Sequence, residues 1–177
     1  MKNKIRNYLR NIKYKSIRIK YLLKGYDIGK NFVIGKQGYI NKTNFKAGNE
    51  IYIGPYHYIS SNTKIGNFCL ISDRVHIVGH DHIFEEVGVP TILAGRPLNQ
   101  PETILEDDVW IGHAVTIIRG ITIGEGSIVG ANSLVTKDIP PYSIYGGTPA
   151  KFLRMRFSSD EERKEHSQKI KELAGKY

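Results

Sequence analysis

Two histidines stand on either side of an aspartate in the segment Gly79–His80–Asp81–His82. A neutral imidazole accepts a proton near pH 7, so a histidine in this segment is a candidate general base for activating a hydroxyl group. Imidazole is also a common zinc ligand, and His76 is close enough in sequence to complete a set of three. The segment therefore indicates proton transfer or metal binding, and the elements around it must decide between them.

The single cysteine, Cys69, is expected to pack in the core, because nothing near it in the sequence would activate a thiol. A chain with one cysteine forms no internal disulfide, which fits a reducing cytoplasm. No apolar run approaches the roughly 18 residues that a membrane-spanning helix needs. The basic N-terminus has no continuous apolar region and no cleavage site of the kind that directs secretion. We therefore expect a cytoplasmic protein.

Aliphatic residues recur every six positions in two stretches of the chain. They are Ile53, Ile59, Ile65, Ile71 and Ile77, and then Leu105, Ile111, Ile117, Ile123, Val129 and Val135. An α-helix advances by about 600° in six residues, so this period would not keep one helical face apolar. Short strands separated by turns explain it, if the aliphatic points inward and the glycine that often follows takes a tight corner, where a side chain or a negative φ would clash. Three such strands close one triangular coil, which predicts a parallel β-helix with coils about 4.8 Å apart.

The limits of the repeat predict the organisation of the chain. We expect the β-helix to occupy residues 27–150, interrupted by an excursion loop at residues 79–104, where the repeat stops and glycine and proline accumulate. Residues 151–177 are expected to form a C-terminal tail with a helix. Ser158 and Ser159, followed by three acidic residues, predict the start of that helix.

The net charge of +9 belongs to the N-terminal extension, residues 1–26. Nine of the 26 lysines and arginines precede the first acidic residue, Asp27, and the remainder of the chain carries 17 basic and 17 acidic residues. Ile5, Tyr8, Leu9 and Ile12 have helical spacing within this basic segment. Either residues 1–24 make peripheral contact with an anionic membrane, or the segment is an arm that packs on the β-helix. No nucleic-acid-binding signature accompanies the charge, so nucleic acid is not expected as a partner.

The sequence resembles the hexapeptide-repeat acetyltransferases, which include galactoside, maltose, xenobiotic and capsule or exopolysaccharide O-acetyltransferases. The resemblance covers about residues 28–154 and is specific over residues 109–154, which read VWIGHAVTIIRGITIGEGSIVGANSLVTKDIPPYSIYGGTPAKFLR. Residues 65–82, IGNFCLISDRVHIVGHDH, resemble the coils that lead into the catalytic loop of these enzymes. The resemblance implies a left-handed β-helix, although crossovers between parallel strands are usually right-handed. It also implies a homotrimer with active sites between subunits.

The activity that the resemblance implies is acetyl transfer from acetyl-CoA to a hydroxyl of a sugar or polysaccharide precursor. His80 stands where the catalytic histidine of the family stands, and would take the hydroxyl proton so that the oxygen attacks the thioester directly. The tetrahedral oxyanion then needs a hydrogen-bond donor. The spacing before His80 is two residues shorter than in the galactoside enzymes, which leaves His82 as a rival. Asp81 is a candidate for orienting the ring or meeting the acceptor.

The same resemblance implies a set of acetyl-CoA contacts. Trp110 matches a tryptophan at the cleft shared by acetyl-CoA and acceptor. The other implied contacts are Gly112, Ala131, Thr136 and Lys137 along the pantetheine arm and adenine end, and Lys151 and Arg154 near the phosphates. Glycine and alanine at such places let a ligand approach the backbone closely. No acceptor-binding residue carries over, and Asp73, Glu85 and Arg96 are candidates only because they lie near the loop in sequence.

Three alternatives stay open. In the first alternative, the acceptor is an amino sugar or an antibiotic instead of a sugar hydroxyl. It stays open because the sequence has no acceptor signature. A second alternative is a zinc enzyme similar to the carbonic anhydrases built on this repeat, with His76, His80 and His82 as ligands. The Trp-Ile-Gly and Gly-Thr-Pro-Ala-Lys signatures favour a CoA enzyme without a metal. A non-catalytic scaffold is the third, and the intact His80 and Lys151 oppose it.

Overall fold

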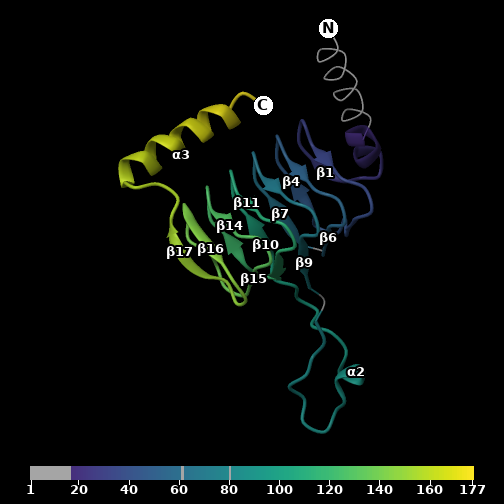
Figure 1. The fold of residues 1–177 in the computed structure, drawn as a ribbon. Helices are drawn as coiled ribbons and strands as arrows, with labels where there is room; N and C mark the ends of the chain where they lie inside the picture. The colour runs from purple at the N-terminus through teal and green to yellow at the C-terminus, as the bar shows by residue number, and fades with distance from the viewer. Residues whose placement is uncertain (1–16, 61, 80) are drawn as a thin grey trace.

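The computed structural model describes residues 17–60, 62–79 and 81–177. Short parallel strands wind into a coil whose three sheets form the faces of a triangular β-helix (Figure 1). Five complete coils are followed by a partial sixth, in which Ile139 bridges to Ile123 and β16 (Ser143–Gly146) extends one face. The predicted fold class, a parallel β-helix, is confirmed.

Each face takes one strand from each of the five complete coils, and face B takes two more strands that follow them. Face A consists of β1 (Asp27–Ile28), β4 (Lys46–Ala47), β7 (Thr63–Ile65), β10 (Thr103–Leu105) and β13 (Thr122–Ile123). Face B consists of β2 (Val33–Ile34), β5 (Tyr52–Ile53), β8 (Leu70–Ile71), β11 (Trp110–Ile111), β14 (Ile128–Val129), β16 and β17 (Lys151–Met155). Face C consists of β3 (Tyr39–Ile40), β6 (Tyr58–Ile59), β9 (His76–Val78), β12 (Thr116–Ile118) and β15 (Leu134–Val135). The turns between faces form three edges, named here A/B, B/C and C/A.

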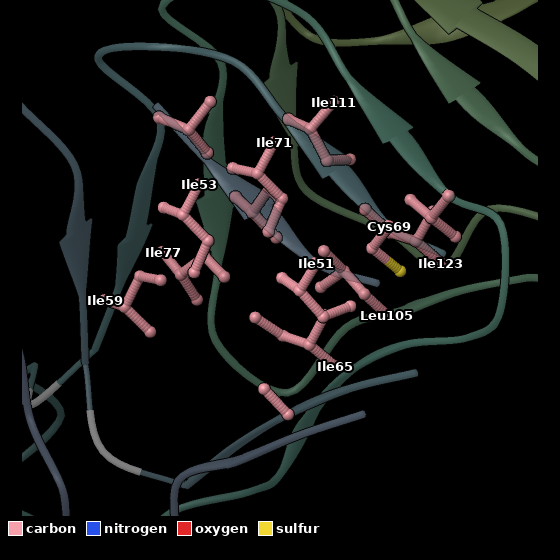
Figure 2. Close-up of a cluster of buried hydrophobic side chains, with 14 of the residues drawn as sticks. Ile51, Ile53, Ile59, Ile65, Cys69, Ile71, Ile77, Leu105, Ile111 and Ile123 are labelled. Atoms are coloured by element: carbon pink, nitrogen blue, oxygen red, sulfur yellow. The ribbon is translucent and has the colours of Figure 1, made fainter. Parts of the chain in front are cut away.

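The six-residue repeat reflects the burial of one aliphatic side chain from each strand. The aliphatics of the first run are at most 2% exposed, and they are Ile53, Ile59, Ile65, Ile71 and Ile77. Figure 2 shows these side chains gathered in the interior together with Cys69, which is 1% exposed, so the packing role predicted for the cysteine is confirmed. Burying one such aliphatic contributes about 1.5–3 kcal/mol, and the sum over the coils stabilises the β-helix.

The glycines that follow the repeat aliphatics are required by coil stacking. A Cβ on Gly54 would lie 2.4 Å from the amide nitrogen of Asp73 in the next coil, so the expected clash of a side chain is confirmed. The expectation that these glycines also need an unusual φ was wrong. Positive φ occurs elsewhere in the turns, mostly at residues other than glycine, for example 53° at Asn31 and 57° at Asp108. Asparagine and aspartate tolerate this conformation better than most side chains.

The excursion leaves the C/A edge after β9 and returns at β10. It extends away from the β-helix in Figure 1 and carries one short helix, α2 (Thr91–Ala94). Strand β10 already begins at Thr103, inside the range expected for the loop. Five large apolar side chains on the excursion are 72–101% exposed, and they are Phe84, Val87, Ile92, Leu93 and Leu98. Such exposure is unusual for a surface that meets only water.

The C-terminal helix α3 (Asp160–Ala174) begins where the sequence predicts. Ser159 is its N-cap, since the serine side chain accepts a hydrogen bond from the amide of Glu162. The Glu162 carboxylate in turn accepts from the amide of Ser159, which completes a capping box. These bonds satisfy amide donors that a helix start leaves without partners.

Helix α3 lies along the A/B edge (Figure 1). The Nε2 atom of His166 is 2.8 Å from Oδ2 of Asp108 in the fourth coil. Nearer the N-terminal end of the β-helix, the Tyr177 hydroxyl donates to Glu50, and Ile170 between these two points is buried. The A/B edge is therefore covered by the helix.

Residues 17–23 are helical and lie against the first coil. Ile17 and Tyr21 pack on the core, and Arg18 Nε donates to the carbonyl of Gly29 at 2.6 Å. The helical spacing predicted for residues 5–12 lies outside the described residues. Within the described residues, no helix combines the length and apolarity needed to cross a membrane.

Candidate active site

The segment expected to carry the catalytic base begins where β9 ends. His80 itself lies outside the described residues, and its neighbours show where the chain leaves the β-helix. A Cβ on Gly79 would lie 3.0 Å from Oγ of Ser60, so the chain departs in close contact with the preceding coil. Asp81 Oδ2 lies 3.5 Å from Nε of Arg119 in the following coil. The residues flanking the predicted base are thus held at the C/A edge.

His82, the rival base, is already engaged within the loop. Its Nε2 lies 3.3 Å from Nη2 and 3.4 Å from Nε of Arg96. A guanidinium group only donates, so Nε2 accepts and Nδ1 carries the proton. That Nδ1 is buried and has no hydrogen-bond partner among the described residues. While Arg96 holds this position, the lone pair of His82 is not free to take a proton from an acceptor.

Trp110 lies near the middle of an apolar column on face B. The column crosses six neighbouring strands in register, through Val33, Tyr52, Leu70, Trp110, Ile128 and Ile144. Trp110 is 46% exposed, and Leu70 and Tyr52 are 43% and 41% exposed. The tryptophan is therefore an outward-facing residue on an open apolar surface, where it can contact a ligand or another subunit.

One chain does not bring Trp110 and the base of the excursion together. In a triangular β-helix the C/A edge lies opposite face B, and Trp110 points outward from that face. Gly79 and Asp81 lie at the C/A edge. A site that uses both groups therefore needs two copies of the chain.

The remaining predicted CoA contacts are distributed over two edges and one end of the β-helix. Gly112 and Ala131 are neighbours on the B/C edge, where a Cβ on Gly112 would lie 2.7 Å from the amide nitrogen of Ala131. Coil stacking thus already requires a glycine at position 112, whether or not a ligand approaches. Thr136 and Lys137 follow β15 on the C/A edge and are exposed. They share this edge with the base of the excursion.

Lys151 and Arg154 lie on β17, at the C-terminal end of face B, and both are exposed. The preceding residues 147–150 run beside β15, where the Ala150 amide donates to the carbonyl of Leu134. Among the described residues, no ion pair involves Lys137, Lys151 or Arg154. Cations without an acidic partner are suited to charge-assisted bonds with phosphate, so this donor set fits the nucleotide end of CoA.

An aspartate–histidine pair on the B/C edge was not foreseen from the sequence. Nδ1 of His113 lies 2.9 Å from Oδ1 of Asp73, and this hydrogen bond lowers the pKa of the Asp73 carboxyl. The two residues are 40 positions apart, but Leu70 and Trp110 are in register, so the third residue after each meets its counterpart. Matching the two runs of the repeat across the excursion would have predicted this contact.

The described histidines do not support the zinc alternative. His76 projects outward from face C with its ring 6.4 Å from that of Tyr58, whereas His82 bonds Arg96 on the excursion. In the described ranges, no three histidine, cysteine, aspartate or glutamate side chains gather in a metal-binding arrangement. The third proposed ligand, His80, lies outside these ranges.

Comparisons with known proteins agree with the fold. Residues 102–137 match the family model described as bacterial transferase hexapeptide (six repeats). The chain is 38% identical over 122 residues to a probable macrolide acetyltransferase of Lysinibacillus sphaericus, with 60% of this chain and 67% of the relative covered. It is 52% identical over 111 residues to a chloramphenicol acetyltransferase of Morganella morganii, with 55% and 53% covered. A solved galactoside acetyltransferase in complex with coenzyme A has a TM-score of 0.52 at 26% identity, covering 75% of this chain and 68% of that one.

The triangular β-helix and the matching family model together define an acyltransferase built on a six-residue repeat. The chain belongs to the hexapeptide-repeat acetyltransferase family. The prediction that it is an acyltransferase dependent on acetyl-CoA is confirmed. The chain spans only about half the length of the chloramphenicol acetyltransferase, and the acceptor, the subunit arrangement and the roles of single residues are matters of proposal.

Proposed function

We propose that the protein transfers the acetyl group of acetyl-CoA to a hydroxyl of a sugar or polysaccharide precursor. The observation that carries the acetyl-CoA part of the proposal is a set of exposed cations at one end of the β-helix, Lys137, Lys151 and Arg154. None of them has an acidic partner among the residues that the structure describes. Acetyl-CoA presents phosphates at its nucleotide end and a thioester at the other. Phosphates bound by these cations would leave the pantetheine arm to run along the coils toward the base of the excursion.

His80 is the proposed general base. It would accept the proton of the acceptor hydroxyl while the oxygen attacks the thioester carbonyl. Collapse of the tetrahedral oxyanion breaks the C–S bond, and the imidazolium returns its proton to the departing sulfur. The contact of His82 with Arg96 supports the choice, because the rival ring already uses its lone pair. An acetylated serine or cysteine is not needed, since the thioester is itself activated.

We propose a homotrimer in which each active site lies between two subunits. The excursion base and Trp110 lie on opposite sides of one β-helix, so a shared site needs two copies. The exposed apolar side chains of the excursion and the apolar column on face B offer surfaces for that contact. Light scattering should give about 60 kDa, three copies of the 20.1 kDa chain. A stable monomer with full activity would contradict the arrangement.

An antibiotic hydroxyl is the second candidate acceptor, because the macrolide and chloramphenicol acetyltransferases are among the similar proteins. A screen with acetyl-CoA, followed by release of free thiol, separates the candidates. Mono- and oligosaccharides should give thiol release well above acetyl-CoA hydrolysis. Release with macrolides or chloramphenicol alone would replace the sugar by an antibiotic, and release with amino sugars alone would indicate N-acetylation. Release with none of them would refute the proposed function.

We also propose a cytoplasmic location with peripheral contact between residues 1–24 and an anionic membrane surface. In the described part of this segment, Leu23 is 84% exposed and Ile19 is 53% exposed, beside Lys20 and Lys24. Sedimentation with vesicles containing anionic lipid should show binding that falls at high salt. Lys20→Glu with Lys24→Glu should weaken it, whereas Lys64→Glu on face A should not. Binding that persists after residues 1–24 are removed would refute the membrane contact and support an arm that only packs on the β-helix.

A further inference from the structure

One arginine ties the outgoing and returning chains of the excursion to the β-helix. Arg119 follows β12 at the C/A edge, and its side chain is only 17% exposed. Its Nε lies 3.5 Å from Oδ2 of Asp81, at the start of the excursion. Its Nη1 donates to the side-chain oxygen of Gln100, near the end of the excursion. A single guanidinium therefore holds two points that are 19 residues apart in the sequence.

The preceding coil holds the same place from the other side. Asn62 Nδ2 donates to the backbone carbonyl of Gln100 at 2.5 Å, and the Ser60 side chain lies against Gly79. The next residue of the returning chain, Pro101, lies against Gly120, where a Cβ would come within 2.8 Å of the proline ring. The outgoing and the returning chain at the base of the excursion are thus both held between two coils. We call the group Asn62, Asp81, Gln100 and Arg119 the clasp.

The clasp also gives the Asp81 carboxylate a structural contact. The sequence made this carboxylate a candidate for orienting the catalytic imidazole. Asp81 pairs with Arg119, and it is the residue directly after the proposed base. Its Oδ2 atom thus helps to hold the chain, and a planar guanidinium with several fixed donor directions suits this task better than a lysine would.

We propose that Arg119 is a positioning residue for acetyl transfer, which holds the chain beside the proposed base through Asp81 and Gln100. The proposal rests on the proposed function and assigns Arg119 no contact with acetyl-CoA or the acceptor. A general base is effective only if its geometry toward the hydroxyl and the thioester is maintained, and a displacement of about 1 Å can cost about 100-fold in rate. A residue that acts in this way should affect turnover more than substrate binding.

Kinetics of Arg119→Met, Arg119→Lys, Asp81→Asn and the Arg119→Met/Asp81→Asn double variant test the proposal. Arg119→Met should lower kcat about 10- to 100-fold and leave KM for acetyl-CoA within about twofold. Arg119→Lys should recover only part of the rate, because lysine cannot bond both partners in the same geometry. The double variant should be no slower than Arg119→Met, since the two residues act through one contact. Arg163→Met is the matched control, because Arg163 is 22% exposed and pairs only with Asp160 on α3 among the described residues.

Hydrogen exchange provides a readout that does not need activity. Peptides from residues 79–103 should exchange faster in Arg119→Met than in the wild type or in Arg163→Met, while those from residues 46–60 stay unchanged. Unchanged exchange would overturn the clasp. Faster exchange with wild-type kcat would overturn the positioning role and leave the proposed function intact. A kcat loss that comes with loss of the oligomer or faster exchange in residues 46–60 would assign Arg119 a merely structural role. If the wild type itself acetylates no acceptor, the proposed function fails, and the exchange experiment alone decides whether Arg119 holds the loop.

Discussion

The A/B and C/A edges belong to the same coils but differ in regularity. At the A/B edge, a ladder of side chains joins successive turns, as the amide of Lys30 donates to Asn49, that of Asn49 to Asn67, and that of Asn67 to Asp107, at 2.6–2.9 Å. Helix α3 covers the same edge through Asp108. Each of these turns therefore repeats the previous one, and α3 adds a further contact to the same edge.

The C/A edge changes from coil to coil. It takes up one extra residue between Ile40 and Ala47 and the whole excursion between Val78 and Thr103. Two of the three buried side-chain atoms that lack a partner among the described residues, Ser60 Oγ and His82 Nδ1, occur at this edge or on the loop that leaves it. Regular stacking at one edge stabilises the β-helix, so the other edge is free to depart from it and to carry a site. Substitutions at the two edges should therefore separate stability from catalysis.

The largest loss of turnover is expected when His80 is replaced. His80→Ala should lower kcat by about 10²–10⁴-fold, the range typical for loss of a general base, while acetyl-CoA affinity stays nearly unchanged. His82→Ala should cost much less and act mainly on acceptor binding or on the order of the loop. Steady-state kinetics, calorimetry with CoA and light scattering of both variants make the comparison. An inactive His82→Ala together with an active His80→Ala would exchange the two assignments.

The phosphate contacts should give the next largest effect. Lys151→Ala with Arg154→Ala should raise KM for acetyl-CoA by about tenfold or more, because two charge-assisted bonds are lost, and should change KM for the acceptor little. Both side chains are exposed, so the fold should persist. Initial rates with each substrate varied in turn measure this. Equal changes in both Michaelis constants would remove these residues from the cofactor site.

A substitution at Asp108 tests how much the A/B edge contributes to stability. The Asp108 carboxylate accepts from Arg156 at 2.6 Å and lies 2.8 Å from His166, so it anchors α3 and the segment before it. Asp108→Asn keeps a residue that tolerates the φ of 57° and removes the charge, which should lower the free energy of unfolding by about 1–2 kcal/mol. Thermal unfolding should show this, with kcat unchanged. Asp160→Asn, at a pair in which Asp160 is 71% exposed, should change stability by less than about 0.5 kcal/mol. A loss of turnover in Asp108→Asn would mean that the two edges are not independent.

The sequence predicts the β-helix well because each repeat buries its own aliphatic against the same position of its neighbours. Ile71 lies beside Ile53 and Ile111, and the six-residue period alone predicts that these positions face the same interior. The start of α3 is equally local, since Ser159 and Glu162 cap the helix within one turn. Interactions with a fixed short spacing can be inferred without knowing the path of the chain.

Contacts across the irregular edge could not be predicted in this way. Arg119 meets Asp81 and Gln100 only because of the path that the excursion takes, and no period relates these positions. The same holds for the anchoring of α3, since His166 and Asp108 are 58 residues apart. The catalytic assignment depends on resemblance for the same reason. Residues 109–154 carry a specific motif, whereas no acceptor-binding residue could be carried over to the coils before the loop.

The smallest expected effect is on the rate at which the Cys69 thiol is labelled. This rate measures how often the A/B edge opens to solvent. Burial raises the pKa of the Cys69 thiol to about 12, and its Sγ lies 3.1 Å from the carbonyl of Glu106 in the next turn of the A/B edge. Only the thiolate reacts with common thiol reagents, and with this pKa about one thiol in 10⁴ is ionised at pH 8, compared with about one in four at an ordinary pKa near 8.5. The native protein should therefore show almost no labelling over the course of an acetyl-transfer assay, and one equivalent after denaturation. Labelling in Asp108→Asn should be faster if loss of the α3 anchor opens this edge, whereas Arg119→Met should label as slowly as the wild type. Rapid labelling of the native wild type would show that the A/B edge opens as readily as the C/A edge, and would contradict the division of roles between them.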